Sequence, residues 1–146
     1  MPRKAKKGKK RVVVDTSVLV AGVAGFKDNY TPDRNPSADV LCKWAEEHTF
    51  VWLVSEDILD EYKEVLRRLR VRSHVIGRLV NLIRERAEEV KIRTSTEISP
   101  DPGDDPFCLC AEQGRADFVV TLNPKDFPQD RLKATVVLPE TLIALR

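Results

Sequence analysis

Short apolar runs rich in β-branched residues alternate with segments of helical periodicity along the whole 146-residue chain. The runs expected to be strands are 12–14, 50–54, 90–92, 118–121 and 135–138. The segments expected to be helices are 17–24, 36–47, 56–70, 73–89 and 107–114, with a closing helix from Pro139. Strands separated by helices are typical of a parallel sheet with helices on both faces. The sequence therefore predicts a three-layer α/β/α sandwich with a central parallel sheet.

Positive charge is concentrated at the N-terminus. Residues 1–11 hold seven of the 25 Lys and Arg and no acid, which leaves 18 basic against 23 acidic side chains in residues 12–146. We therefore expect a basic disordered arm over residues 1–10 and one folded domain over residues 11–146. The arm is either a solubilising tail or a contact for a phosphate backbone. Its candidate nucleic-acid-binding residues are Arg3, Lys4, Lys6, Lys7, Lys9 and Lys10.

The rest of the composition argues against a secreted or membrane protein. No apolar run is long enough to span a bilayer, and the basic N-terminus lacks the apolar segment of a secretory signal. The three cysteines, Cys42, Cys108 and Cys110, are too few and too unevenly spaced for a disulfide framework or a zinc site. We therefore expect a cytoplasmic protein with reduced thiols.

Asp15 follows the first apolar run, where the carboxyl end of a strand is expected. Ligands bind at this edge of open α/β sheets. An isolated carboxylate at the end of an apolar strand is costly unless a partner compensates its charge. Asp15 is therefore either the N-cap of the next helix or a metal ligand.

Further acids are expected at the same edge of the sheet. They are Glu61, Asp104, Asp105 and Asp126, whereas Asp117 falls at the opposite edge and is expected to be a structural turn residue. Glu61 has no basic residue three or four positions away on its helix, so it is either solvated or directed towards a group off the helix. Two carboxylates about 4 Å apart repel by roughly 4 kcal/mol at an effective dielectric near 20, so converging acids need a cation.

Ligands that are all oxygen favour Mg²⁺ or Mn²⁺. Such an ion polarises a phosphoryl oxygen and lowers the pKa of a water that it binds, which suits phosphodiester hydrolysis. No nucleophilic triad and no Gly-rich phosphate loop is present in the sequence, and neither His48 nor His74 is assigned a role. A phosphatase of the haloacid dehalogenase type is disfavoured, because Ser17 stands where that chemistry requires a second Asp.

Four segments, in this order, resemble the PIN-domain ribonucleases, a family that includes many prokaryotic toxin–antitoxin toxins. They are VVVDTSVLVAG at Asp15, SEDILDEYKEVL at Glu61, DPGDDPFCLCA at Asp104 and DFVVTLNPKDF at Asp126. The resemblance spans residues 11–140. It implies cleavage of single-stranded RNA with Mg²⁺ or Mn²⁺, a toxin role, an antitoxin partner and a homodimer.

The resemblance also implies which residues form the site. The metal-binding and catalytic acids would be Asp15, Glu61, Asp104 and Asp126, with Ser17, Asp105, Thr121 and Asn123 in support. Asn123 stands where some branches of the family place the fourth acid, so we expect Asp126 to fill this role with the amide oxygen of Asn123 assisting. The alternative is a non-catalytic PIN-like module that binds RNA or a protein partner.

Overall fold

The computed structural model describes residues 9–27, 34–93 and 105–145, and within them five parallel strands form one sheet in the order β3-β2-β1-β4-β5. The strands are β1 (Lys10–Val14), β2 (Phe50–Val54), β3 (Glu88–Glu89), β4 (Phe118–Val120) and β5 (Thr135–Val137). Every neighbouring pair is parallel. The predicted parallel sheet is therefore confirmed.

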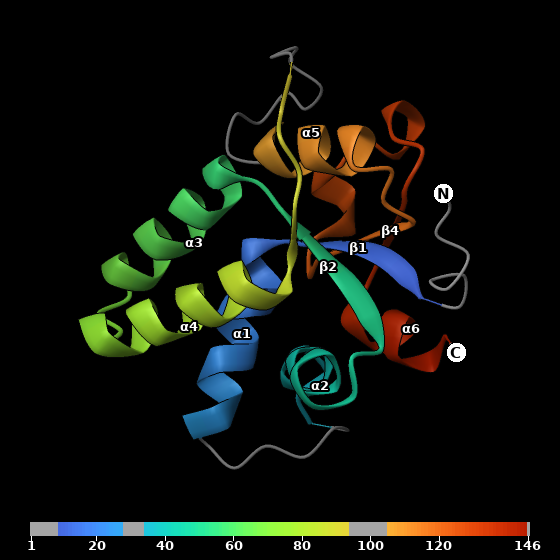
Figure 1. Ribbon diagram of the computed structural model, residues 1–146. Coiled ribbons are helices and arrows are strands. Elements are labelled where there is room, and N and C mark those ends of the chain that lie inside the picture. Colours follow the sequence, from blue (N-terminus) through green and yellow to red (C-terminus); the bar gives the residue numbers. More distant parts are fainter. Residues whose placement is uncertain (1–8, 28–33, 94–104, 146) are drawn as a thin grey trace.

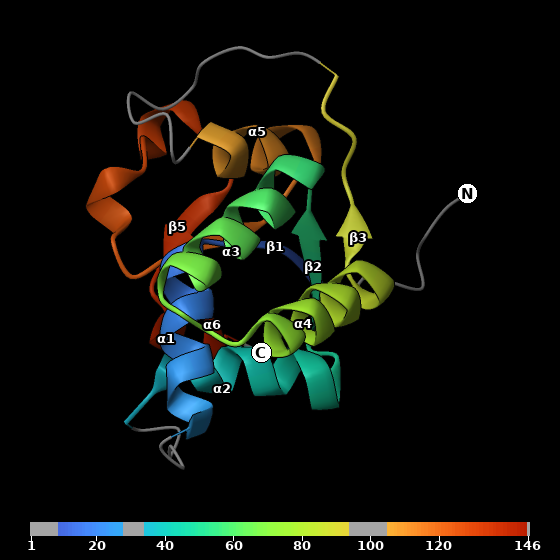
Figure 2. The same ribbon diagram turned by 90° about the vertical axis from the view of Figure 1, so that its left-hand side faces the viewer.

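Helices cover both faces of this sheet. Helix α5 lies on one face and α1, α2 and α6 lie on the other, while α3 packs against α4 beside β2 and β3 (Figure 1; Figure 2). The α-helices are α1 (Thr16–Lys27), α2 (Pro36–Cys42), α3 (Glu56–Arg68), α4 (Ser73–Arg86), α5 (Asp105–Gln113) and α6 (Pro139–Ala144). A π-helical turn, η2 (Lys43–Glu47), continues α2, and two 3-10 turns, η3 (Pro124–Asp126) and η4 (Gln129–Arg131), join β4 to β5. The predicted three-layer sandwich is confirmed.

The central strand β1 is the point at which the strand order reverses. The chain first proceeds from β1 through β2 to β3 and then returns to β4 on the other side of β1. Val14 and Val120 are paired at the ends of β1 and β4, and the Asp15 N–H donates to the Val120 carbonyl at 2.9 Å. Ligands of open α/β sheets bind at such a switch point.

The apolar stripe predicted for residues 56–70 packs into the core. Ile58, Tyr62 and Leu66 are buried, and α3 begins where Ser55 Oγ accepts from the Ile58 N–H at 3.3 Å. This serine cap satisfies one N–H that the first turn of a helix leaves unpaired. Glu64 pairs with both Arg67 and Arg68 one turn further along, as their spacing predicts.

The prediction of a strand at 90–92 is wrong, because the third strand begins two residues earlier, at Glu88. The third strand pairs through Glu88 and Glu89, and the Val90 N–H then donates to the Val54 carbonyl at 2.7 Å. Strand β2 ends at Val54, so β2 offers no ladder partner to the residues after Val90. The apolar signal in 90–92 therefore comes from Val90, which is buried just after the end of β3.

Helix α1 extends beyond the predicted end at residue 24. A Cβ on Gly22 would clash with the Leu41 side chain, and one on Gly25 would clash with Asn35. These glycines therefore allow α1 to approach α2 closely. The predicted end at residue 24 left residues 25–27 outside the helix, because a glycine in a helical segment can signal close packing as well as a helix end.

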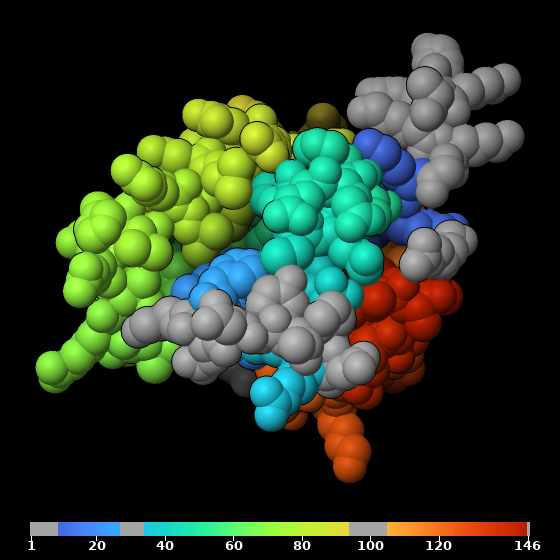
Figure 3. Space-filling view, turned by 90° about the horizontal axis from the view of Figure 1, so that it is seen from below, coloured from blue at the N-terminus to red at the C-terminus, as the bar shows by residue number. Residues whose placement is uncertain are grey.

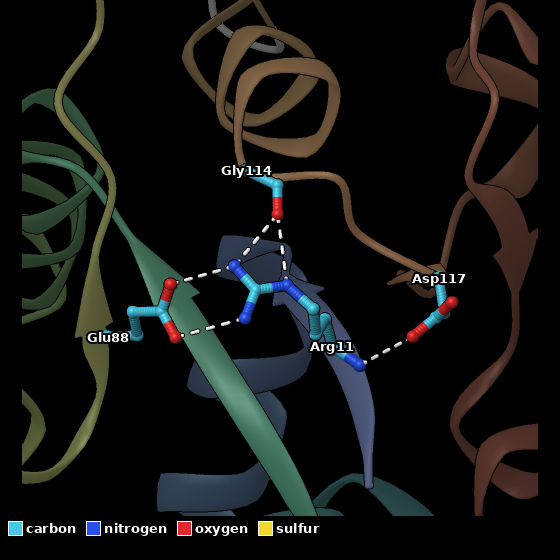
Figure 4. Close-up of polar contacts among 4 residues, drawn as sticks. All are labelled: Arg11, Glu88, Gly114 and Asp117. Carbon is cyan, nitrogen blue, oxygen red and sulfur yellow. Dashed lines mark hydrogen bonds and ion pairs between the residues drawn. The ribbon is translucent and has the colours of Figure 1, made fainter. Parts of the chain in front are cut away.

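Arg11, near the amino end of β1, joins this strand to β3, to the end of α5 and to the start of β4 (Figure 4). Its guanidinium donates to both carboxylate oxygens of Glu88, at 3.0 and 2.7 Å, and to the Gly114 carbonyl just after α5, at 3.0 and 2.9 Å. The Arg11 N–H donates to Asp117 Oδ2 at 2.8 Å, and the Asp117 N–H donates to the Arg11 carbonyl at 2.7 Å. Asp117 is thus the structural turn residue that the sequence predicts.

Candidate active site at the β1–β4 switch point

Asp15 lies at the centre of a hydroxyl network at the carboxyl ends of β1 and β4. Its Oδ2 accepts from Ser17 Oγ at 2.7 Å and from Thr121 Oγ1 at 2.8 Å, and the residue is only 7% exposed. The Asp15 carbonyl starts α1 by accepting from the Val18 N–H at 3.0 Å. In the described part of the chain the carboxylate accepts no backbone N–H of α1, so Asp15 does not cap the helix through its side chain.

The turn after β4 holds this network in place. The Leu122 N–H donates to Ser17 Oγ at 3.1 Å, and the Asn123 N–H donates to Thr121 Oγ1 at 3.0 Å. Each hydroxyl therefore accepts from the backbone of this turn and donates to the same oxygen of Asp15. The arrangement orients the Asp15 carboxylate through two elements that are more than 100 residues apart in the sequence.

The Tyr62 hydroxyl binds the backbone immediately before Asp15. Its hydroxyl donates to the Val14 carbonyl at 2.5 Å and accepts from Trp52 Nε1 at 3.3 Å. Burial raises the pKa of the Tyr62 hydroxyl well above its ordinary value, and the negative charge of Asp15 raises this pKa further, whereas the bond from Trp52 lowers it. The hydroxyl therefore stays protonated and acts as a donor to the residue that precedes Asp15.

The oxygen atoms gathered here suit a hard divalent cation. Asp15 Oδ2 is held by two hydroxyls, and no hydrogen bond to Oδ1 comes from the described residues. Beside Asp15 in the chain, Thr16 Oγ1 is buried with no hydrogen-bond partner in that same part of the protein. A carboxylate with neighbouring hydroxyls is an all-oxygen donor set of the kind that Mg²⁺ and Mn²⁺ prefer.

The other predicted acids are placed separately by the structure. Glu61 is half-buried on α3 and lines a shallow hollow on the surface of that helix with Asp57 and Asp60. Asp105 is the first residue of α5 and is half-buried, and Asp126 is the exposed last residue of η3. None of these three shares a hydrogen bond with Asp15 among the contacts of the described residues.

Asn123 is exposed at the start of η3, and only its backbone N–H joins the Asp15 network. Lys9 and Lys10 are exposed, and Lys10 begins β1. Five predicted residues, Asp104, Arg3, Lys4, Lys6 and Lys7, lie outside the described residues.

The described acids do not form a complete metal centre by themselves. Within residues 9–27, 34–93 and 105–145, no group of three or more His, Cys, Asp or Glu side chains lies close enough to hold a metal ion. Asp104 falls outside these ranges. The metal-holding roles of Glu61, Asp104 and Asp126 therefore stay predictions.

Tyr62 was assigned no role at the site in the sequence analysis. The available signal was the residue type, because a buried tyrosine hydroxyl usually finds a hydrogen-bond partner. Thr121 and Ser17 were predicted as supporting residues, and the structure brings both against Asp15.

Comparison with known families matches residues 11–125 to the PIN domain. This match covers most of the chain and all four segments that carry the resemblance, except the last two residues of the fourth. The chain therefore belongs to the PIN domain family. A search of curated proteins found no match. None of the helices in the described part of the chain is both long and apolar enough to cross a membrane.

Proposed function

We propose that this protein is a metal-dependent endoribonuclease that hydrolyses phosphodiester bonds of single-stranded RNA. The observation that carries this proposal is the Asp15 network at the β1–β4 switch point, in a chain of the PIN domain family. PIN domains have a nuclease-type fold, and RNA is the substrate class that the family resemblance implies.

Asp15 would hold Mg²⁺ or Mn²⁺ together with Glu61, Asp104 and Asp126. A bound divalent cation supplies Lewis-acid polarisation of a phosphoryl oxygen and acidifies water in its shell. The two hydroxyls of Ser17 and Thr121 fix the direction in which Asp15 presents its carboxylate. Asp126 or Asp104 would orient the attacking water or accept its proton, which requires a carboxylate within hydrogen-bond reach of that water.

Asp105 and Asn123 would support the site. Asp105 begins α5, where a carboxylate is favourable because of the positive end of the helix dipole. The amide oxygen of Asn123 would assist Asp126. If wild-type protein neither cleaves RNA nor binds Mn²⁺, Asn123→Asp is the first substitution to restore a fourth acid.

We propose one nuclease domain over residues 11–146, preceded by a basic arm over residues 1–10. The arm would add a contact with the RNA backbone that does not depend on the RNA sequence. A toxin role, an antitoxin partner and a homodimer are proposed on the family resemblance alone. The thiols of Cys108 and Cys110 are buried and reduced, which supports a reducing, cytoplasmic location. Growth arrest on expression that is absent with Asp15→Asn would support the toxin role.

The proposed activity is tested by incubating a mixed pool of single-stranded RNA with Mn²⁺ and purified protein. We expect cleavage by wild type, loss of cleavage with chelator, and loss of at least 100-fold in rate with Asp15→Asn. Glu61→Gln should also lose cleavage, whereas Asp60→Asn, an exposed acid on the same helix, should not. Cleavage by Asp15→Asn at the wild-type rate would overturn the proposal. RNA binding without Mn²⁺ binding or cleavage would instead identify a non-catalytic module.

A further inference from the structure

The connection between α3 and α4 carries a dense group of arginines. From Val65 to Arg84 the sequence contains six arginines and no acid. We call the four of these that lie closest together, Arg67, Arg68, Arg70 and Arg72, the arginine turn. The turn lies at the far end of α3 from the sheet and projects at the left margin of the space-filling view, in light green (Figure 2; Figure 3).

Among the described residues, one carboxylate pairs with this group of positive charges. All four side chains are exposed, and Glu64 is the shared partner of Arg67 and Arg68. Arg70 and Arg72 have no carboxylate within 4.0 Å in the described part of the chain. Of these four exposed guanidinium groups, two share one carboxylate and two have none in the described part of the chain, whereas acids outnumber basic residues over residues 12–146.

The backbone holds Arg70 where glycine is the usual residue. Helix α3 ends with the Val71 N–H donating to the Leu66 carbonyl at 3.1 Å and the Arg70 N–H donating to the Arg67 carbonyl at 3.0 Å. This pattern closes a helix C-terminus with a left-handed residue, here Arg70 at φ 65°. A non-glycine residue is disfavoured in this conformation, so arginine is used here against local backbone preference.

The arginine turn continues the helix that carries Glu61. The shallow hollow that Glu61 lines extends along α3 to Glu64 and Arg67. Arg68, the last residue of α3, lies seven positions after Glu61, which is about 10 Å at the rise of an α-helix, and Arg70 follows two positions later. A single strand of RNA that reaches the proposed site along α3 would therefore also contact the arginine turn.

We propose that the arginine turn binds the phosphate backbone of single-stranded RNA, beside the site in which a phosphodiester is hydrolysed. The inference rests on the proposed function for its substrate. Leu69 is 55% exposed between Arg68 and Arg70, which places an apolar surface among the guanidinium groups. Unpaired bases can lie on apolar and guanidinium surfaces while arginine contacts the phosphates, as in other single-strand-binding proteins. An acidic site needs such an attractive contact to hold a polyanion nearby.

The test measures RNA binding by fluorescence anisotropy, in the full chain with Asp15→Asn to prevent cleavage. The probe is a fluorescein-labelled single-stranded RNA of mixed sequence, titrated at several NaCl concentrations. In this background we compare Arg70→Gln/Arg72→Gln with Arg115→Gln/Lys133→Gln, which removes two exposed positive charges elsewhere on the protein. Thermal unfolding by circular dichroism verifies that each variant is folded.

Each phosphate contact on a single strand contributes about 0.7 to the slope of log affinity against log salt. Loss of two contacts should therefore lower the slope by about 1.4 and the affinity about 25-fold at 0.1 M salt. The control pair should retain the slope of its parent. Equal losses in both pairs, or no loss in the arginine pair, would overturn the proposal. Weakened binding of polyglutamate with unchanged RNA binding would also overturn it and would indicate an acidic protein partner.

Failure of this inference and failure of the proposed function give different results. If wild-type protein cleaves RNA while the arginine pair binds it as the parent does, the nuclease stands and the arginine turn has no role. If wild-type protein never cleaves RNA but the arginine pair alone loses RNA binding, the turn is an RNA contact on a protein that is not a nuclease. Hydrolysis of bis(p-nitrophenyl) phosphate with Mn²⁺, a substrate too small to reach the turn, should be unchanged in Arg70→Gln/Arg72→Gln.

Discussion

The Tyr62 hydroxyl donates a hydrogen bond of 2.5 Å to the Val14 carbonyl. Val14 precedes Asp15 and Tyr62 follows Glu61, so this one bond joins the two segments that carry two of the predicted metal-binding acids. Both partners are fully buried. Helix α3 is therefore fixed to the end of β1 at the level of the site, and the bond holds together the two backbone segments that carry these acids.

Tyr62→Phe should weaken both the fold and the site. The substitution leaves the Val14 carbonyl and Trp52 Nε1 buried without this partner, which we expect to lower the free energy of unfolding by about 1–3 kcal/mol. It should also lower Mn²⁺-dependent RNA cleavage at temperatures where the variant is fully folded. Urea unfolding and cleavage rates measure the two effects. Reduced stability with unchanged cleavage would show that Tyr62 supports the fold alone.

Thr121→Val should impair the site more than it destabilises the fold. The substitution keeps the volume of a fully buried residue and removes the hydroxyl that donates to Asp15 and accepts from the Asn123 N–H. Residues that orient a metal ligand typically contribute 10- to 100-fold to metal affinity or activity, and we expect a loss of this size in RNA cleavage. Thr141→Val, at an exposed position on α6, is the matched control. Wild-type cleavage by Thr121→Val would contradict the role of the hydroxyl network.

Arg11→Lys should destabilise the protein without a direct effect on the site. Lysine cannot bind both oxygens of Glu88 and the Gly114 carbonyl at once, as the planar guanidinium does. Because Arg11 and Glu88 are partly exposed, the expected loss is only about 1–2 kcal/mol in urea unfolding. Arg115→Lys, at an exposed position, is the control and should leave the stability unchanged. Equal stability of the two variants would refute the structural role of Arg11.

The stability of the protein should fall in alkali because of Cys110. Burial raises the pKa of this thiol from 9.0 to about 12. Between these values the unfolded chain loses the proton while the folded chain keeps it, so the free energy of unfolding decreases as the pH rises. From pH 8 to pH 10.5 this one group accounts for a loss of about 2 kcal/mol. Over the same pH range, the free energy of unfolding of Cys110→Ala should fall by about 2 kcal/mol less than that of wild type. Identical pH profiles of the two proteins would contradict the assignment.

Most of the fold follows from local sequence patterns. Strand β2 falls where Phe50 to Val54 predicts it, and Ser55 caps the helix that follows, because both signals are contained in adjacent residues. The third strand was misplaced because its extent depends on where β2 ends, which is a property of the partner. The end of α1 was misplaced because Gly25 serves the contact with α2.

The site was predictable only in part. Asp15 and Thr121 each follow a strand directly, so a parallel sheet brings them to one edge whatever the details of packing. The hydrogen bond of Tyr62 joins residues 48 positions apart, and no local pattern specifies it. The directions of Glu61 and Asp126 depend on rotamers and on neighbouring elements, which spacing along the chain does not determine.

The most direct test of the central claim is calorimetric titration of Mn²⁺ into wild type, Asp15→Asn and Asp130→Asn. Asp130 is an exposed acid in η4 and provides a control of equal charge change. We predict that wild type and Asp130→Asn bind Mn²⁺ with the same affinity and that Asp15→Asn shows no measurable binding. Equal Mn²⁺ affinity in all three proteins would contradict the claim that the β1–β4 switch point holds the metal through Asp15.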